Sequence, residues 1–108
     1  MSIEPKITVR NMSSTDSLVS AINDKTTKLT KFANQITRCD MMVEAPSGHH
    51  THGGHFRVRV RVTIPGGELV ADRDPSNANN HEDVYIAIRD AFEAMERQLK
   101  SHYDRKRA

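Results

Sequence analysis

The sequence predicts an α+β domain with the element order β-α-β-β-β-α, in which two helices cover one face of a four-stranded sheet. Two apolar periods support this two-layer sandwich. Four short segments alternate apolar and polar residues, as half-buried strands do, and two longer segments repeat apolar residues at helical spacing. The 108 residues suffice for one modest core, so we expect a single domain over residues 1–108.

The N-terminal third is predicted to form a strand and a helix. Residues 6–10 alternate, with Ile7 and Val9 on the buried side of a short strand. Over about residues 16–34 the apolar period becomes that of a helix. The apolar residues on one side of that helix are Leu18, Ile22, Leu29 and Phe32.

Three further strands are predicted before the second helix. The first, residues 36–45, would bury Cys39, Met41 and Val43. The second, residues 56–64, alternates most clearly, and its buried side would carry Phe56, Val58, Val60, Val62 and Ile64. A Pro-Gly-Gly turn leads into the last strand, residues 68–72. The helical crossover predicts a parallel first pair of strands, followed by an antiparallel meander.

A long helix is predicted at the C-terminal end, after a polar loop at residues 74–80. Asn80 is a candidate N-cap, and Glu82 and Asp83 would place negative charge in the first helical turn. The buried stripe of this helix would be Ile88, Ala91, Phe92, Met95 and Leu99. Its outer side offers two i,i+4 ion pairs, Glu93–Arg97 and Glu96–Lys100.

Charge and cysteine content restrict the class of protein. The 16 Lys and Arg nearly balance the 14 Asp and Glu, so affinity for nucleic acid would depend on how the cations are arranged. The single Cys39 forms no internal disulfide and is expected to be a buried structural thiol. No apolar run resembles an export signal or a membrane span, so we expect a cytoplasmic protein. No catalytic constellation stands out, which argues against an enzyme.

Three arginines, Arg57, Arg59 and Arg61, would line the polar face of the strand at residues 56–64, spaced at roughly 6–7 Å. In register, they suit an anionic partner, and nucleic-acid phosphates are the first candidate. The other interpretation is a solvated strand face whose charge is relieved by acidic neighbours. The alternation alone does not decide between the two.

A second basic feature lies on the first predicted helix, where Lys25, Lys28 and Lys31 follow at three-residue steps. No acidic residue is expected on their side of the helix, which favours a binding role over a solvated flank. Single lysine side chains suit phosphate contacts that need no base readout.

Four segments carry a resemblance to a known family. They read KLTKF at residues 28–32, PGGEL at 65–69, EDVYIAI at 82–88 and ERQLK at 96–100. With the element order, they resemble the ribosome hibernation promoting factor family, which includes ribosome-associated inhibitor A (protein Y), over nearly the whole chain. The basic end, without an acidic tail or a dimerisation domain, is similar to the short form of that family.

The resemblance implies a fold similar to double-stranded RNA-binding domains and a role in ribosome hibernation. Such a protein binds 16S rRNA of the small ribosomal subunit near the decoding centre, also within the 70S ribosome. It blocks mRNA and tRNA access under stress or in stationary phase, as a translation inhibitor without catalysis. The resemblance implies no cofactor, no DNA, no membrane and no obligate small-molecule ligand.

The residues that match the family's rRNA-binding cations by position are Lys25, Lys28, Lys31, Arg97 and Lys100. Ala94 and Ser101 stand where many relatives carry a basic residue. The candidates that would compensate for them are Arg57, Arg59, Arg61 and Arg89. Asp83 and Tyr85 also match the family, and we expect them to cap and pack the last helix.

A histidine-rich loop with His49, His50, His52 and His55 is the rival signal. Four imidazoles so close together could gather zinc, nickel or copper, which would make the chain a metal-responsive binding protein on the same fold. No Cys, Asp or Glu lies within the cluster and its glycines confer flexibility, so adventitious metal binding is expected. A third interpretation is an RNA contact that strengthens at mildly acidic pH, where histidines gain charge.

Overall fold

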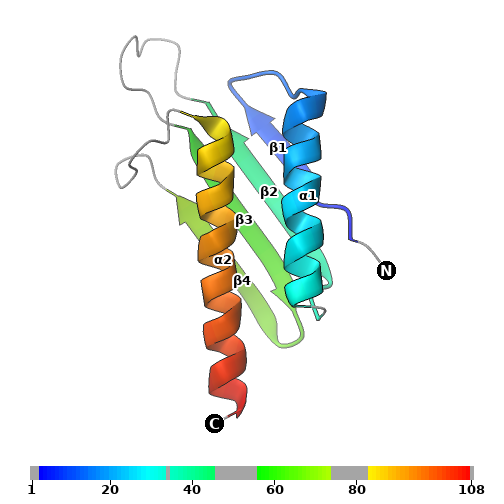
Figure 1. Cartoon of the computed structure of the whole chain (residues 1–108), viewed down its shortest axis with the longest axis vertical. Coiled ribbons are helices and arrows are strands. Elements are labelled where there is room, and N and C mark those ends of the chain that lie inside the picture. The colour runs from blue at the N-terminus through cyan, green and yellow to red at the C-terminus, as the bar shows by residue number, and fades with distance from the viewer. Residues whose placement is uncertain (1–2, 34, 46–55, 74–82, 108) are drawn as a thin grey trace.

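The elements of the chain follow the predicted order in a computed structural model, which describes residues 3–33, 35–45, 56–73 and 83–107. They are β1 Lys6–Arg10, α1 Asp16–Phe32, β2 Arg38–Glu44, β3 Arg57–Ile64, β4 Gly67–Arg73 and α2 Val84–Arg107 (Figure 1). The predicted α+β class is therefore confirmed, with small differences at the element ends. The predicted loop at residues 74–80 lies outside the described residues.

The four strands form one sheet in the order β1-β2-β3-β4, and both helices cover the same face of it (Figure 1). β1 runs parallel to β2, whereas β2–β3 and β3–β4 are antiparallel, as predicted. This topology leaves one sheet face without helical cover and places β1 and β4 at the sheet edges.

The core lies between the sheet and the two helices. Val58, Val60 and Val62 of β3 are fully buried there, while the arginines between them point to the other sheet face. The largest buried side chains of the helices are Leu18, Ile22, Leu29, Ile88, Met95 and Leu99. Burial of one such side chain stabilises the fold by about 1.5–3 kcal/mol.

Phe32 was predicted to be part of this core, but 48% of its surface is exposed. At about 100° of rotation per residue, Phe32 lies at the margin of the stripe that Ile22 and Leu29 define on α1. The apolar period therefore located the centre of the buried stripe correctly and its edge incorrectly.

Asp83 fixes the start of α2. Its carboxylate oxygen Oδ1 accepts a 2.8 Å hydrogen bond from the backbone N–H of Tyr85. The prediction that Asp83 lies in the first turn is wrong, because α2 begins at Val84 and has no acidic residue in that turn. The predicted capping role of Asp83 is confirmed. Asn80 and Glu82 lie outside the described residues.

Local chemistry also fixes the start of α1 and the β3–β4 turn. The Thr15 hydroxyl oxygen accepts a 3.1 Å hydrogen bond from the N–H of Leu18 and so caps α1. In the turn, Gly66 follows Pro65 and adopts a positive φ of 93°, a conformation that disfavours side chains.

Of the helices in the described ranges, neither has the length and apolar character needed to cross a membrane.

Candidate nucleic-acid interface

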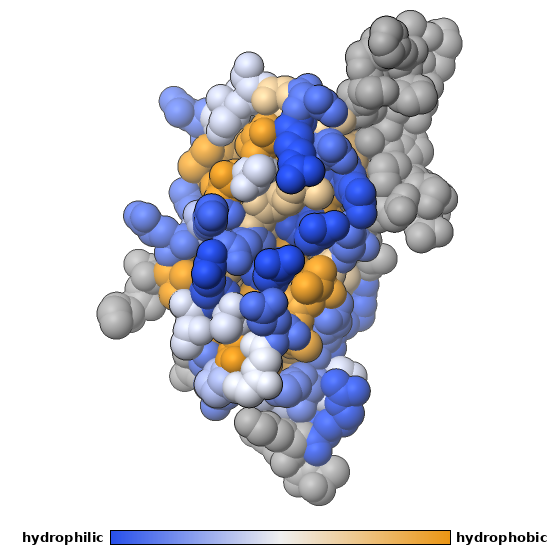
Figure 2. All heavy atoms as spheres, turned by 180° about the vertical axis from the view of Figure 1, so that it is seen from behind, coloured by the Kyte–Doolittle hydropathy of each residue, from blue (hydrophilic) through white to orange (hydrophobic). Residues whose placement is uncertain are grey.

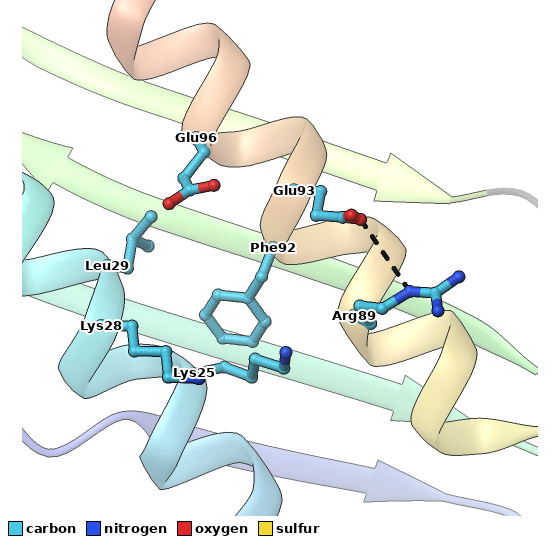
Figure 3. A pocket seen from close by; sticks show the side chains of 7 residues that line it. All are labelled: Lys25, Lys28, Leu29, Arg89, Phe92, Glu93 and Glu96. Atoms are coloured by element: carbon cyan, nitrogen blue, oxygen red, sulfur yellow. Dashed lines mark ion pairs between the residues drawn. The ribbon is translucent and has the colours of Figure 1, made fainter.

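α1 and α2 form a narrow cleft of about 100 Å³ between them. Figure 3 shows its lining, which consists of Lys25, Lys28 and Leu29 from α1 and Arg89, Phe92, Glu93 and Glu96 from α2. The cleft thus brings together three of the cations predicted to bind rRNA, from two segments that are far apart in the sequence.

The helical stripes that build the core also position these side chains. Ile22 lies on the side of α1 that is buried against the core, so Lys25 and Lys28 lie on the flank of α1 that is turned toward α2. Arg89 and Phe92 lie about one turn apart on α2. The ring of Phe92, only 4% exposed, lies between the two helices and supports the cleft from below (Figure 3).

Acidic residues of α2 share the cleft with the cations. Arg89 forms ion pairs with Asp90 at 3.1 Å and with Glu93 at 3.9 Å. Lys25 and Lys28 form no salt bridge with any other residue of the described ranges. Their ammonium groups remain available to an anionic ligand, although the nearby glutamates reduce the positive potential of the cleft.

Packing corrects the prediction that the lysine row is free of acids. Glu93 and Glu96 reach the row from α2, and Asp24 lies one turn before Lys28 on α1 itself. The predicted pair of Glu93 with Arg97 is also wrong, because Glu93 lies beside Arg89 instead. Both arginines are four residues from Glu93 and compete for one carboxylate. Within the described part of α2, Glu96 and Lys100 do not form the other predicted pair either.

The remaining helix cations lie outside the cleft. Lys31 and Lys100 are exposed on α1 and α2. Arg97 lines a separate groove on the other side of α2, where Gln98 Nε2 donates a 2.7 Å hydrogen bond to the Val70 carbonyl of β4. These three cations therefore extend the basic surface around the helices without lining the cleft.

Arg57, Arg59 and Arg61 lie on the opposite, open face of the sheet. Asp72 lies between the first two and accepts hydrogen bonds from Arg57 Nη2 at 3.0 Å and Arg59 Nη2 at 3.2 Å. Arg61 lies 3.8 Å from Glu68. The register explains this, because Arg59 and Asp72 are directly opposite each other on β3 and β4. Charge relief by acidic neighbours, one of the two predicted interpretations, therefore describes much of this stripe.

The arginine pair also changes the acidity of Asp72. Burial pushes the pKa of this carboxyl upward, but the hydrogen bonds and charges of Arg57 and Arg59 outweigh burial. The pKa therefore falls below its ordinary value of 3.8. Asp72 is ionised at neutral pH and holds both guanidinium groups against the sheet.

The comparison with known families agrees with this architecture. Residues 6–107 match the family described as Sigma 54 modulation protein / S30EA ribosomal protein. The chain belongs to this family. Relatives in the family carry the names that the sequence resemblance predicted, so that prediction is confirmed.

Two relatives illustrate the relationship. The Ribosome hibernation promotion factor of Deinococcus radiodurans is 28% identical over 91 residues, which cover 84% of this chain and 44% of that protein. The Ribosome hibernation promoting factor of Pseudomonas putida is 36% identical over 52 residues, which cover 48% of this chain and 45% of that protein. The matched segments therefore cover less than half the length of each of these relatives.

Two solved structures share the fold. The crystal structure of the Thermus thermophilus Protein Y N-terminal domain superposes with a TM-score of 0.65 at 22% identity, over 94% of this chain and 99% of that one. A ribosomal subunit interface protein from Coxiella burnetii superposes with a TM-score of 0.69 at 14% identity, over 93% and 97%. The chain thus shares its two-layer β-α-β-β-β-α fold with both structures.

In this family member, sequence reasoning missed cations that join the strand arginines on the open sheet face. Lys6 lies opposite Asp40 in the β1–β2 register, and Asp40 in turn lies opposite Arg61. Arg10 and Arg38 lie on the same face. The alternation of β1 indicated that Lys6 and Arg10 face away from the core, but the period does not reveal which strands are neighbours. Figure 2 shows that this face is largely hydrophilic, with a few apolar side chains among the polar ones.

Burial decides the remaining candidates. Cys39 is 1% exposed, and burial raises the pKa of its thiol to about 11, so the predicted structural role is confirmed. Tyr85 was expected to have a structural packing role in the last helix; its side chain lies in the first turn of α2 and is 45% exposed, so it packs only in part. The four loop histidines lie outside the described residues. Elsewhere in the described chain, no cluster of three or more metal-ligating side chains occurs.

Proposed function

We propose that the chain is a ribosome-associated hibernation factor that binds the small ribosomal subunit. The observation that carries this proposal is the cleft in which Lys25, Lys28 and Arg89 converge, in a domain that belongs to this family.

The chemistry of the cleft favours rRNA phosphates as ligand. Lys25 and Lys28 present ammonium groups that are not engaged by other described residues, and ammonium groups bind phosphates as point charges. Phe92 is too deeply buried to stack on a base, so the cleft reads charge and shape but not sequence. Lys31, Arg97 and Lys100 provide further contacts along the exposed helix surface.

We further propose that the domain binds 16S rRNA near the decoding centre, both in free small subunits and in 70S ribosomes. This binding would occur during stress or stationary phase. A rigid domain held there by phosphate contacts would block mRNA and tRNA by its volume alone. This mechanism requires no catalytic group and no cofactor. The metal-responsive alternative depends on a histidine loop outside the described residues, and no described residue supports it.

Competition with initiator tRNA tests this proposal. We expect increasing amounts of the protein to displace mRNA-dependent initiator tRNA from small subunits. The Lys25→Gln/Lys28→Gln variant should require about thirtyfold more protein, because it removes two charged interactions of about 1 kcal/mol each. The measurement is tRNA retention on filters as a function of protein concentration.

The control matches the cleft variant in charge. Ser20→Glu/Asn23→Glu lowers the net charge by the same amount at exposed positions on the flank of α1 away from α2. This control should displace tRNA as the wild type does. If saturating wild-type protein leaves tRNA binding unchanged, or if the two variants behave alike, the proposed mode of action is wrong.

A further inference from the structure

The open face of the sheet contains a shallow hollow of about 220 Å³ over β1, β2 and β3, on the side opposite the helix cleft. Its lining includes five cations, Lys6, Arg10, Arg38, Arg59 and Arg61, and a single carboxylate, Asp40. The lining of the hollow therefore carries more positive than negative charge, although Arg38, Arg59 and Arg61 are each in an ion pair.

The sheet register accounts for this excess. Lys6, Asp40 and Arg61 form one row across three strands, so a cation flanks Asp40 on each side. Arg38 reaches the same carboxylate, with its Nε 3.2 Å from an oxygen of Asp40. One carboxylate thus orders several cations without neutralising them all. Arg59 pairs with Asp72 and Arg61 pairs with Glu68. Both of these acidic residues belong to β4 and do not line the hollow.

The edge strand β1 carries two cations that are not engaged in ion pairs with other described residues. Neither Lys6 nor Arg10 forms a salt bridge with another residue in the described ranges. Both side chains are exposed on β1, the last strand of the sheet on that side. In the β1–β2 register Lys6 lies opposite Asp40 and Arg10 lies opposite Glu44. Neither cation is held in an ion pair with its neighbour, so both can turn toward an approaching anion.

We propose that this hollow binds a second segment of RNA backbone, so that the domain holds RNA phosphates on both of its faces. The proposal rests on the ribosome-binding function above and adds a second contact surface to it. A protein held between two RNA segments would bridge them, which a domain with one basic face does not do.

The surface chemistry favours RNA over an acidic protein segment. Protein interfaces gain most of their affinity from buried aromatic and apolar anchors. Among the described residues, the open face has no aromatic side chain and exposes little apolar surface beyond Val70 and Met42. RNA backbone contacts need only cations and polar groups, and arginine suits phosphate because its guanidinium can bind two oxygens at once.

The test compares three variants with equal change in charge. Lys6→Gln/Arg10→Gln alters the sheet face, Lys25→Gln/Lys28→Gln alters the cleft, and Ser20→Glu/Asn23→Glu is the control. All six positions are at least partly exposed on the surface, so melting temperatures should stay close to wild type, and this is checked first. Binding is then measured against protein-free 16S rRNA and against small subunits over a salt series.

We expect the sheet variant to bind both protein-free 16S rRNA and small subunits several-fold more weakly than the control. The slope of log K against log salt should fall by about 0.7–0.9 for each phosphate that the variant no longer neutralises. In one possible outcome, wild-type protein binds, the cleft variant does not, and the sheet variant binds as well as the control. That result would overturn the proposal of a second RNA-binding surface and leave the proposed function intact.

Two other outcomes are also informative. A sheet variant that loses affinity for small subunits but not for 16S rRNA would show that the hollow contacts a ribosomal protein, and the RNA proposal would be wrong. Failure of the wild type to bind small subunits would overturn the proposed function itself, together with the inference that depends on it.

Discussion

Asp72 joins two guanidinium groups through one carboxylate, and this geometry makes stability depend on pH. Because Arg57 and Arg59 lower its pKa in the folded state, the pairs stabilise the fold above the ordinary value of 3.8. That contribution disappears as the pH falls from 3.8 through the lower folded pKa. Partial exposure and screening keep the effect small, at about 1 kcal/mol or less.

We therefore expect the Asp72→Asn variant to unfold at a lower temperature than wild type at pH 7, and the difference to stay nearly constant down to about pH 5 and to shrink as the pH falls below 3.8. Thermal denaturation of both proteins across this range measures the effect. Asp104→Asn serves as a control, because Asp104 is exposed near the end of α2. A difference between Asp72→Asn and wild type that stays constant with pH would contradict the role assigned to the ionised carboxylate.

Cys39 provides a second test at the scale of one residue. Its thiol is buried and has a pKa raised to about 11, so the reactive thiolate is scarce and shielded near neutral pH. We expect no alkylation by iodoacetamide at pH 8 in the folded protein and complete alkylation in denaturant. Mass spectrometry after timed quenching distinguishes the two states. Rapid modification of the folded protein would mean that β2 opens locally far more often than its burial implies.

Among the elements, α2 offers the clearest test of local structure. The Asp83 carboxylate caps its first turn, and removal of such a cap costs about 0.5–2 kcal/mol. Asp83→Ala should lower the midpoint of urea unfolding by a corresponding amount without changing the slope of the transition.

Asp104→Ala is the matched control at the other end of α2. It removes the same charge near the C-terminus of the helix, where a negative charge is unfavourable, so it should have no effect or stabilise slightly. Equal destabilisation by the two substitutions would show that the Asp83 side chain acts through net charge and not as a cap.

Much of the element order was predictable because each element has a clear period. β3 is the best case, since its valines alternate with arginines along the whole strand and only one register buries the valines. The period failed at the margin of the stripe on α1, where Phe32 is exposed. It also left the start of α2 open, because several residues before Val84 are good caps.

The candidate site was less predictable than the fold, since it depends on contacts between elements. The sequence indicated the cations on each helix but not that Glu93 and Glu96 would approach Lys25 and Lys28. Likewise, Asp72 follows Arg57 by fifteen residues, and only the β3–β4 register brings them together. Pairing of this kind requires knowledge of which strands and helices are neighbours.

At the scale of the whole molecule, a formal net charge of only +2 conceals two basic surfaces. One surrounds the cleft between α1 and α2, and the other covers the β1 side of the open sheet face. Acidic residues interleaved with both keep the chain close to neutral, which limits indiscriminate binding to nucleic acid. Binding to a ribosome through phosphate contacts should nevertheless weaken steeply with salt.

Sedimentation of the protein with purified small and large ribosomal subunits over a salt series tests most directly whether the cleft binds small-subunit rRNA. We expect wild-type protein and the Ser20→Glu/Asn23→Glu control to sediment with small subunits, and added salt to release them. The Lys25→Gln/Lys28→Gln variant should bind more weakly, with a log–log salt slope smaller by about one to two. Equal sedimentation of this variant and the wild type, or no preference for small subunits, would contradict the claim that the cleft binds small-subunit rRNA.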